Sequence, residues 1–145
     1  MPSIVRVAST VVLDDAGDIL AVRNRRPWGQ DAWGLPGGTC ETGETMEEGA
    51  RRETLEETGL DVKVGRVLSV SERIGHEHHL FIIFAATVRG GILAVRDDDE
   101  DVVEAVFLPL ARAEELMPRY HRPLAALARR SGVGYRGEHR PTRRR

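Results

Sequence analysis

The stretch GGTCETGETMEEGARRETLEETGL, residues 37–60, decides the fold of this chain. Thr45 is a residue type that caps helix N-termini, and Glu48 three positions later completes a capping box. Gly59 stands where a helix is expected to end in a left-handed conformation, which glycine adopts most easily. The stretch therefore predicts a loop that leads into a short acidic helix between Thr45 and Gly59.

Three glutamates are predicted to share one side of this helix. At about 100° per residue, with Glu53 at zero, Glu57 falls at about 40° and Glu56 at about −60°. Like charges on one face repel each other, so a cation is the natural partner of this acidic stripe, and Mg²⁺ prefers such oxygen ligands. Gly49 and Ala50 lie on the same side one turn earlier, where small side chains leave room for a ligand. The alternative is an acidic face that meets only solvent.

The spacing of residues around this helix is specific. It reads G-x5-E-x7-R-E-x-x-E-E-x-G and is followed by the aliphatic Leu60. This pattern resembles the Nudix box, and WGLPGG at residues 33–38 is a common lead-in to that box. The position after Glu53 is usually aliphatic in the Nudix family, whereas this chain has Thr54, a departure that affects packing rather than chemistry. The fixed positions of the box are met by Gly38, Glu44, Arg52, Glu53, Glu56, Glu57 and Gly59.

The resemblance implies a fold and a metal site. The family fold is an α/β/α sandwich with a curved mixed β-sheet, beside which the box forms a loop–helix–loop unit. The ion is expected to be Mg²⁺, with Mn²⁺ as the alternative. Arg52 and Glu44 are expected to pair and to hold the loop against the helix, with Glu44 near the metal. The metal ligands that the resemblance implies are Glu53, Glu56, Glu57 and the backbone carbonyl of Gly38.

The same resemblance implies metal-dependent hydrolysis of the diphosphate linkage in a nucleoside diphosphate derivative. The general base is expected to be Glu53 or a later glutamate, of which Glu104 is preferred to Glu100. A (d)NTP, cleaved to NMP and pyrophosphate, is the expected substrate, because markers of other subfamilies outside the box are absent. ADP-ribose or a nucleotide sugar is the alternative substrate. A non-catalytic nucleotide-sensing module is the alternative class, which the intact box disfavours.

An arginine cluster precedes the box. Residues 23–26 read RNRR directly after an expected strand, and a guanidinium group pairs with phosphate oxygens two at a time. Arg23 is the first candidate for a phosphate contact and Arg25 the second; the alternative is a solvated surface cluster. Trp28 in the next loop is expected either to stack on the nucleotide base or, the favoured alternative, to pack against the sheet.

The rest of the chain alternates strands with a few helices. Strands at residues 4–13 and 19–22 are expected to form a hairpin around a turn. The apolar run LFIIFAATV at residues 80–88 predicts a central strand that is buried on both faces. The histidines within residues 76–79 are interpreted as structural or exposed, and the acidic run at 97–101 as a solvated loop. Further strands are expected at 33–35, 60–71 with an interruption at Gly65, 92–95 and 102–108, and helices at 111–117 and 124–130.

Composition and charge bear on the partners and the cellular location of the protein. The chain has 145 residues and a net charge of −2, and residues 136–145 hold five arginines and one glutamate. Taking their +4 from the total leaves −6 for residues 1–135, which argues against a stable nucleic-acid partner. No apolar run suits a membrane span, the start does not resemble a signal peptide, and a lone Cys40 suits a cytoplasmic location. We expect one domain over residues 1–134, a disordered basic tail over 135–145 and a small nucleotide as partner. Members of the family are often dimers, and the sequence leaves a homodimer and a monomer as alternatives.

Overall fold

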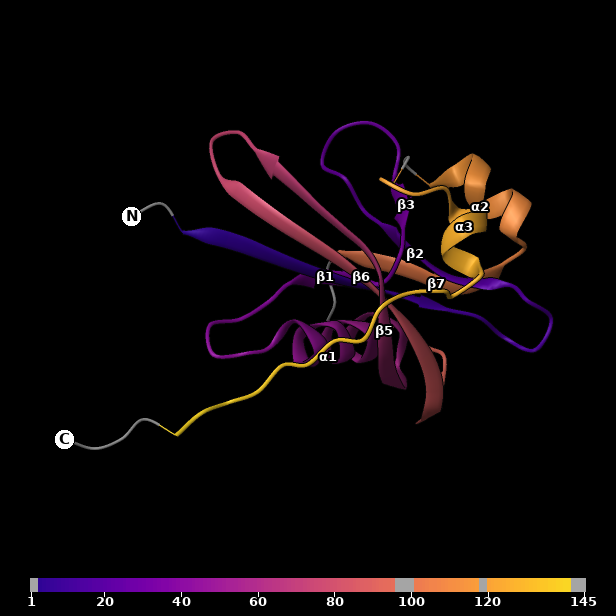
Figure 1. Ribbon diagram of the computed structural model, residues 1–145. Coiled ribbons are helices and arrows are strands. Elements are labelled where there is room, and N and C mark those ends of the chain that lie inside the picture. The colour runs from indigo at the N-terminus through magenta and orange to yellow at the C-terminus, as the bar shows by residue number, and fades with distance from the viewer. Residues whose placement is uncertain (1–2, 96–100, 118–119, 142–145) are drawn as a thin grey trace.

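The computed structural model describes residues 3–95, 101–117 and 120–141. The described chain is an α/β/α sandwich, as expected from the sequence (Figure 1). The elements in chain order are β1 (Ile4–Val12), β2 (Ile19–Asn24), β3 (Ala32–Gly34), β4 (Gly37–Thr39), α1 (Met46–Thr58), β5 (Leu60–Ile74), β6 (His78–Gly91), β7 (Val102–Leu108), α2 (Leu110–Leu116) and α3 (Leu124–Ala128).

The strands form two sheets. One has four strands in the order β4-β1-β6-β5, and the other has three in the order β3-β2-β7. The larger sheet is mixed, because β1 runs parallel to β6 while β4 and β5 are antiparallel to their neighbours. The strand predicted at residues 80–88 is the inner strand β6, and it is longer than the apolar run suggested.

The predicted hairpin of residues 4–22 is wrong. Its turn is present, since Asp14 accepts hydrogen bonds from the N–H groups of Ala16 and Asp18 and Gly17 has a φ of 82°. However, β6 pairs along one edge of β1 and β4 pairs with residues 7–9 on the other edge, and the described residues of β1 and β2 form no ladder. A single bridge between Leu13 and Ile19 joins the two segments, and β2 pairs with β3 and β7 instead.

Other strand boundaries also differ from the prediction. β5 runs continuously through Gly65, with register shifts between Val64 and Ser69 that bend the strand. The strand predicted at residues 92–95 is absent: β6 ends at Gly91, which has a φ of 86°, and the Ala94 N–H donates to the Thr58 carbonyl. Most of the acidic run, residues 97–100 with Glu100, lies outside the described residues.

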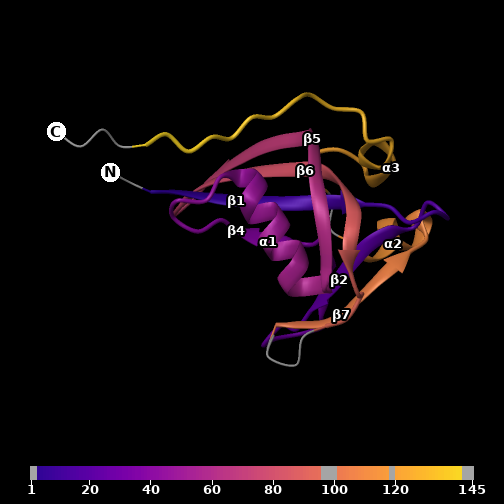
Figure 2. The same cartoon turned by 90° about the horizontal axis from the view of Figure 1, so that it is seen from below.

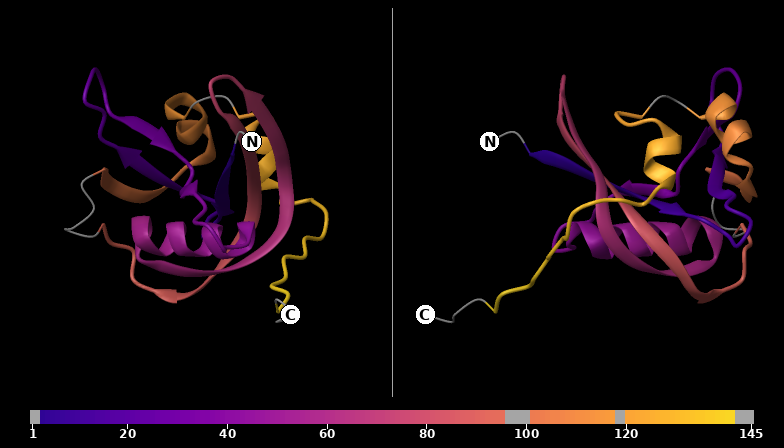
Figure 3. Two further views of the ribbon diagram at one scale, coloured as in Figure 1. Left: turned by 90° about the vertical axis from the view of Figure 1, so that its left-hand side faces the viewer. Right: turned by 45° about the vertical axis from the view of Figure 1, so that its right-hand side comes forward.

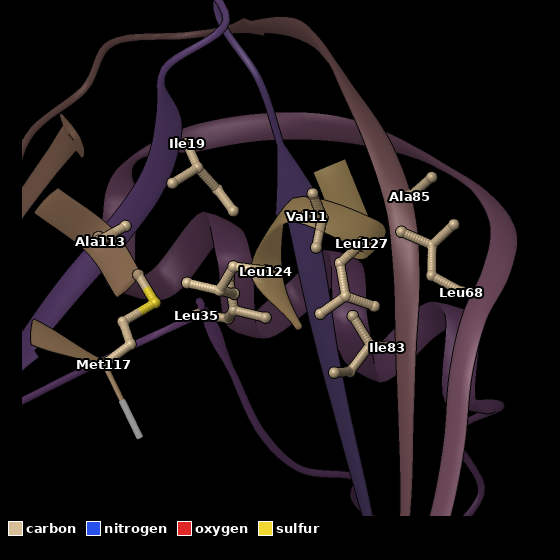
Figure 4. Packing of buried hydrophobic residues seen from close by; sticks show 11 residues of the cluster. Val11, Ile19, Leu35, Leu68, Ile83, Ala85, Ala113, Met117, Leu124 and Leu127 are labelled. Carbon is tan, nitrogen blue, oxygen red and sulfur yellow. The ribbon is translucent and has the colours of Figure 1, made fainter. Parts of the chain in front are cut away.

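The two helical layers bury separate cores on the two faces of the larger sheet (Figures 2 and 3). α1 packs on one face, where Ala8, Met46, Ala50 and Phe84 form a buried cluster. α2 and α3 cover the other face, where their apolar side chains meet both sheets (Figure 4). α3 is shorter than predicted, since Arg130 has a left-handed φ of 58°. Within the described ranges, no helix is both long and apolar enough to cross a bilayer.

Candidate active site

The ends of α1 are set by its own sequence. The Thr45 hydroxyl accepts a hydrogen bond from the Glu48 N–H, and the Glu48 carboxylate accepts one from the Thr45 N–H, each at 3.2 Å. Gly59 ends the helix with a φ of 76°, and its N–H donates to the Leu55 carbonyl. The predicted capping box and left-handed stop are therefore both confirmed. They fix where the glutamates of the helix stand relative to the preceding loop.

Thr54 has a hydrogen-bond partner on β1, the hydroxyl of Thr10. Its hydroxyl lies 2.9 Å from the hydroxyl of Thr10, and it also donates to the Ala50 carbonyl. Both threonines are fully buried, and buried hydroxyl groups need such partners. The polar residue at a position that is usually aliphatic in the family is thus part of a buried contact that joins α1 to β1. Leu55, the next residue along the helix, is 40% exposed, so it does not take over the burial at this position.

Glu53 and Glu57 lie against the glycine loop. Glu57 is buried, and its Oε1 accepts a hydrogen bond from the Gly37 N–H at 2.9 Å. A Cβ added at Gly38 would lie 2.6 Å from the Cδ of Glu53, so any larger residue at this position would push that carboxylate aside. Loop and helix therefore meet at two carboxylates.

Arg52 is the cation at the centre of this group. Its Nε and Nη2 donate to the two oxygens of Glu44 at 2.7 and 3.0 Å, which is the pairing that the sequence predicted. Its Nη1 donates to Glu53 at 3.0 Å and to Glu56 at 3.1 Å. Nη2 also donates to the Thr39 carbonyl at 3.2 Å. One guanidinium group thus ties the loop to the helix and gathers three of the glutamates.

Burial and charge act in opposite directions on these carboxylates. Burial raises the pKa of Glu53, while the hydrogen bond and the charge of Arg52 oppose that rise. The hydrogen bonds from Arg52 lower the pKa of Glu44. Those same bonds to Glu44 are the main reason why the pKa of Arg52 is raised. The site therefore contains a firmly ionised Glu44–Arg52 pair. Next to it lies Glu53, whose charged form is disfavoured by burial.

The donor set fits a divalent ion. When ionised, the four glutamates at positions 44, 53, 56 and 57 outnumber the single positive charge of Arg52. Their oxygens and the nearby Gly38 backbone are the ligand types that Mg²⁺ prefers. Among the described residues, no three His, Cys, Asp or Glu side chains stand in a metal-ligating arrangement, and Arg52 binds Glu53 and Glu56. The side chain of Glu56 is 44% exposed, so it has room to turn toward an ion.

The space predicted beside Gly49 and Ala50 is filled by the protein itself. A Cβ added at Gly49 would lie 2.5 Å from the Sγ of Cys40, and Ala50 is fully buried in the cluster with Phe84. These small residues let the loop pack closely on α1 and do not leave room for a ligand. The prediction is therefore wrong, because it treated the helix without the loop in front of it.

The substrate-side candidates lie on the smaller sheet and its loop. Arg23 in β2 stands opposite Glu104 in β7, and its Nε donates to that carboxylate at 3.0 Å. Its Nη1 donates to Asp31 at 2.7 Å. The side chain of Arg25 is exposed, and Trp28 is 88% exposed, so the expected packing of Trp28 against the sheet is wrong. Arg23 and Glu104 thus form a pair of their own, separate from the group around Arg52.

Two residues that the sequence reasoning missed hold the loop at its ends. The Tyr120 hydroxyl accepts a hydrogen bond from the Leu35 N–H at 2.9 Å, and burial raises the pKa of Tyr120. The Tyr135 hydroxyl accepts one from the Met46 N–H at 3.2 Å. They are the only two tyrosines of the chain. Neither tyrosine belongs to a periodic pattern that would predict its position. The small number of tyrosines was the only feature of the sequence that could have drawn attention to them.

Two of the histidines within residues 76–79 make local contacts with neighbouring side chains. His78 lies 2.5 Å from a carboxylate oxygen of Glu72, and His79 lies 3.6 Å from one of Glu77 while its ring stacks on Phe81. These residues belong to the end of the β5–β6 hairpin. The interpretation of the histidines as structural or exposed agrees with these local contacts.

Together, the sandwich fold and the glycine loop that meets an acidic helix define a class of α/β proteins with a loop–helix carboxylate site. The NUDIX domain model matches residues 4–128, and the chain belongs to the NUDIX domain family.

Similarity to known proteins agrees with this assignment. The chain is 35% identical over 113 residues to the ADP-ribose pyrophosphatase of Methanocaldococcus jannaschii, over 76% of this chain and 65% of that protein. It is 34% identical over 104 residues to the human 8-oxo-dGDP phosphatase NUDT18, over 71% of this chain and 32% of that protein. The chain thus spans less than two thirds of either relative. A solved NUDIX hydrolase from Nitrosomonas europaea has a similar fold, with a TM-score of 0.69, 20% identity, and coverage of 92% and 93% of the two chains.

Proposed function

We propose that this protein hydrolyses the diphosphate linkage of nucleoside diphosphate derivatives with the help of a divalent metal ion. The observation behind this proposal is the group of glutamates that Arg52 and the glycine loop gather at one place. A structural acidic face would point into solvent, whereas Glu57 and Glu53 are turned inward onto the loop backbone. Membership of the NUDIX domain family supports the same reaction.

The residues have distinct roles in this proposal. Glu53, Glu56, Glu57 and the Gly38 carbonyl hold Mg²⁺, or Mn²⁺ in its place, which when bound neutralises the diphosphate and lowers the pKa of a water. Arg52 and Glu44 fix the loop against α1 and so set the spacing of the ligands. Glu53 is the first candidate for the general base because burial already raises its pKa. Glu104 is the second candidate, on the smaller sheet.

Arg23, Arg25 and Trp28 form the proposed substrate side. Two of the five N–H donors of Arg23 contact Asp31 and Glu104, which leaves donors of the same rigid fork for a phosphate. Arg25 offers a second guanidinium group at the end of β2. Trp28 presents an exposed aromatic face, which suits stacking on a nucleotide base.

We propose a (d)NTP as the first substrate to test, with NMP and pyrophosphate as products. ADP-ribose or a nucleotide sugar is the second, because one relative is named an ADP-ribose pyrophosphatase. The other relative is named an 8-oxo-dGDP phosphatase, which favours an oxidised purine nucleotide within the panel. The single, buried Cys40 thiol suits a reducing compartment such as the cytoplasm.

A substrate panel tests the proposal. The protein is incubated with (d)NTPs, 8-oxo-dGTP, 8-oxo-dGDP, ADP-ribose and nucleotide sugars, with Mg²⁺, with Mn²⁺ or with a chelator. Products are separated by chromatography. Turnover of at least one compound, lost in the chelator, is the expected result. Binding of a nucleotide without turnover would replace the enzyme by a nucleotide-sensing module, and turnover that persists in the chelator would reject the metal.

The metal ligands are tested by Glu56→Gln and Glu57→Gln. A glutamine at position 57 can still accept the hydrogen bond from Gly37, and the side chain of Glu56 is 44% exposed. Both variants should therefore fold. Each loses one ionised ligand, so we expect kcat/KM to fall by about 100-fold or more, as for removal of one group that stabilises charge in the transition state.

Glu47→Gln is the matched control for this pair. Glu47 is exposed in the first turn of the same helix, so its substitution changes the net charge equally without touching the site. Its turnover should stay within about twofold of wild type. Near-wild-type turnover in Glu56→Gln or Glu57→Gln would show that these residues are not metal ligands.

A further inference from the structure

The segment after α3 crosses the molecule and reaches the start of α1 (Figures 1 and 2). It lies beyond residues 4–128, which match the family model, and the sequence suggested a free tail from residue 135. The structure instead shows residues 131–139 in contact with β5 and α1. We call this segment the C-terminal strap.

The strap makes contacts at alternate residues. The backbone N–H and carbonyl of Val133 each pair with Val67 on the outer edge of β5, at 3.1 and 2.9 Å. Tyr135, Gly137 and His139 then contact the N-terminal end of α1 in turn. Contacts at every second residue are what an extended chain gives when one of its sides faces the protein. The strap is therefore an extended segment laid on the body, without being a full strand.

Tyr135 is the anchor of the strap. Its ring packs edge-to-face on the fully buried Phe84, with 5.0 Å between ring centroids and an angle of 81°. Its hydroxyl accepts a hydrogen bond from the Met46 N–H, one of the first amides of α1, which have no acceptor within the helix. Tyr135 also packs against the cluster that contains Cys40. The anchor thus closes the core beneath the loop that leads into α1.

Gly137 and His139 contact both members of the capping box. A Cβ added at Gly137 would lie 2.8 Å from the Cβ of Thr45, so the chain passes closely over the cap. The His139 Nε2 lies 2.5 Å from the Oε1 of Glu48, the oxygen that also accepts from the Thr45 N–H. The strap therefore stabilises the first turn of α1 from outside.

We propose that the C-terminal strap holds α1 and the loop at residues 40–45 in their working position, with Tyr135 as a positioning residue. The loop contains Glu44, which binds Arg52, so release of the strap loosens the pair that sets the spacing of the site glutamates. The strap itself is independent of the proposed function. Only its effect on turnover rests on that function.

Cys40 reports whether the strap is closed. It is the only cysteine, is buried at 8% exposure, and belongs to the cluster against which Tyr135 packs. Burial also raises the pKa of its thiol. The experiment follows the reaction of Cys40 with a thiol reagent, in the full-length protein, at several urea concentrations below the unfolding transition. Labelling through local opening depends weakly on urea, whereas labelling through global unfolding rises steeply with it.

Tyr135→Ala is expected to label about tenfold faster than wild type in the absence of urea, with little dependence on urea. Gly137→Ala, which keeps the tyrosine but crowds Thr45, should change the rate in the same direction by a smaller factor. Tyr135→Phe keeps the ring and should stay nearer wild type. Leu124→Ala is the control: it removes a buried side chain from the core on the opposite face, so its labelling should follow global unfolding.

The strap proposal is rejected if Tyr135→Ala labels at the wild-type rate, or if its labelling follows global unfolding as in Leu124→Ala. Turnover then tests the positioning role. On the substrate found in the panel, Tyr135→Ala should lower kcat about tenfold with KM little changed, and Tyr135→Phe should restore most of it. Faster labelling with unchanged kcat would reject the positioning role alone. Absence of turnover in wild type would reject the proposed function, while the labelling result would still decide the strap.

Discussion

Arg52 holds three glutamates and one backbone carbonyl at once, and its planar fork is what allows this. A lysine at this position keeps the charge but has a single nitrogen, so it cannot make the two parallel bonds to Glu44 together with those to Glu53 and Glu56. We expect Arg52→Lys to lower the free energy of unfolding by about 1.5–3 kcal/mol, the range for hydrogen bonds to charged groups. Urea unfolding at pH 7, followed by circular dichroism, measures the loss.

Arg51→Lys is the control on the neighbouring position. Arg51 also binds a carboxylate with two nitrogens, at 2.8 and 3.2 Å from Asp61, but its side chain is 49% exposed. Exposed ion pairs contribute little, so this substitution should lower the free energy of unfolding clearly less than Arg52→Lys does. Equal losses in the two variants would contradict a special role of the Arg52 fork.

At the scale of the element, the contact between Thr54 and Thr10 decides how α1 sits on β1. Thr54→Val leaves the buried hydroxyl of Thr10 without this partner, and we expect the free energy of unfolding to fall by about 1–3 kcal/mol. Replacing both threonines by valine removes donor and acceptor together, so the double variant should be more stable than Thr54→Val. A double-mutant cycle by urea unfolding measures this coupling; additive losses would contradict it.

The individual elements differ in how far the sequence alone could predict them. α1 was predictable at both ends because Thr45, Glu48 and Gly59 act within a few residues of one another. The partners of β1 were not, since its edges are taken by β4 and by β6, a strand that begins at His78. Gly49 looked like free space because the helix was considered alone, whereas Cys40 in the loop directly before the helix packs against it.

At the scale of the whole molecule, residues that lie far from the candidate site in the sequence hold its loop in place. Tyr120 and Tyr135 accept hydrogen bonds from Leu35 and Met46, so the segment between those two residues is fixed at both ends by the last third of the chain. That segment includes the glycine loop and Glu44. The motif therefore predicted which residues of the loop and the helix meet. It could not predict the two tyrosines that hold this segment in place, because they lie far away in the sequence.

Asp61 links three elements of the fold, namely β5, α1 and β6, so its ionisation should make the stability of the whole fold depend on pH. Asp61 in β5 binds Arg51 of α1 at 2.8 Å and Arg89 of β6 at 3.4 Å. The hydrogen bond from Arg51 is the main reason why the pKa of Asp61 lies below its ordinary value of 3.8.

A carboxyl group whose pKa is depressed by folding stabilises the folded state above its unfolded pKa, and this contribution is lost as the pH falls through the folded pKa. The difference in free energy of unfolding between wild type and Asp61→Asn should therefore be largest near pH 7. It should shrink below about pH 4 and vanish once Asp61 is protonated in both states. Because both arginines are exposed, added salt at neutral pH should also reduce this difference. Urea unfolding of the two proteins across this pH range measures the difference, and a difference that stays constant down to about pH 2 would show that the charge of Asp61 does not join the three elements.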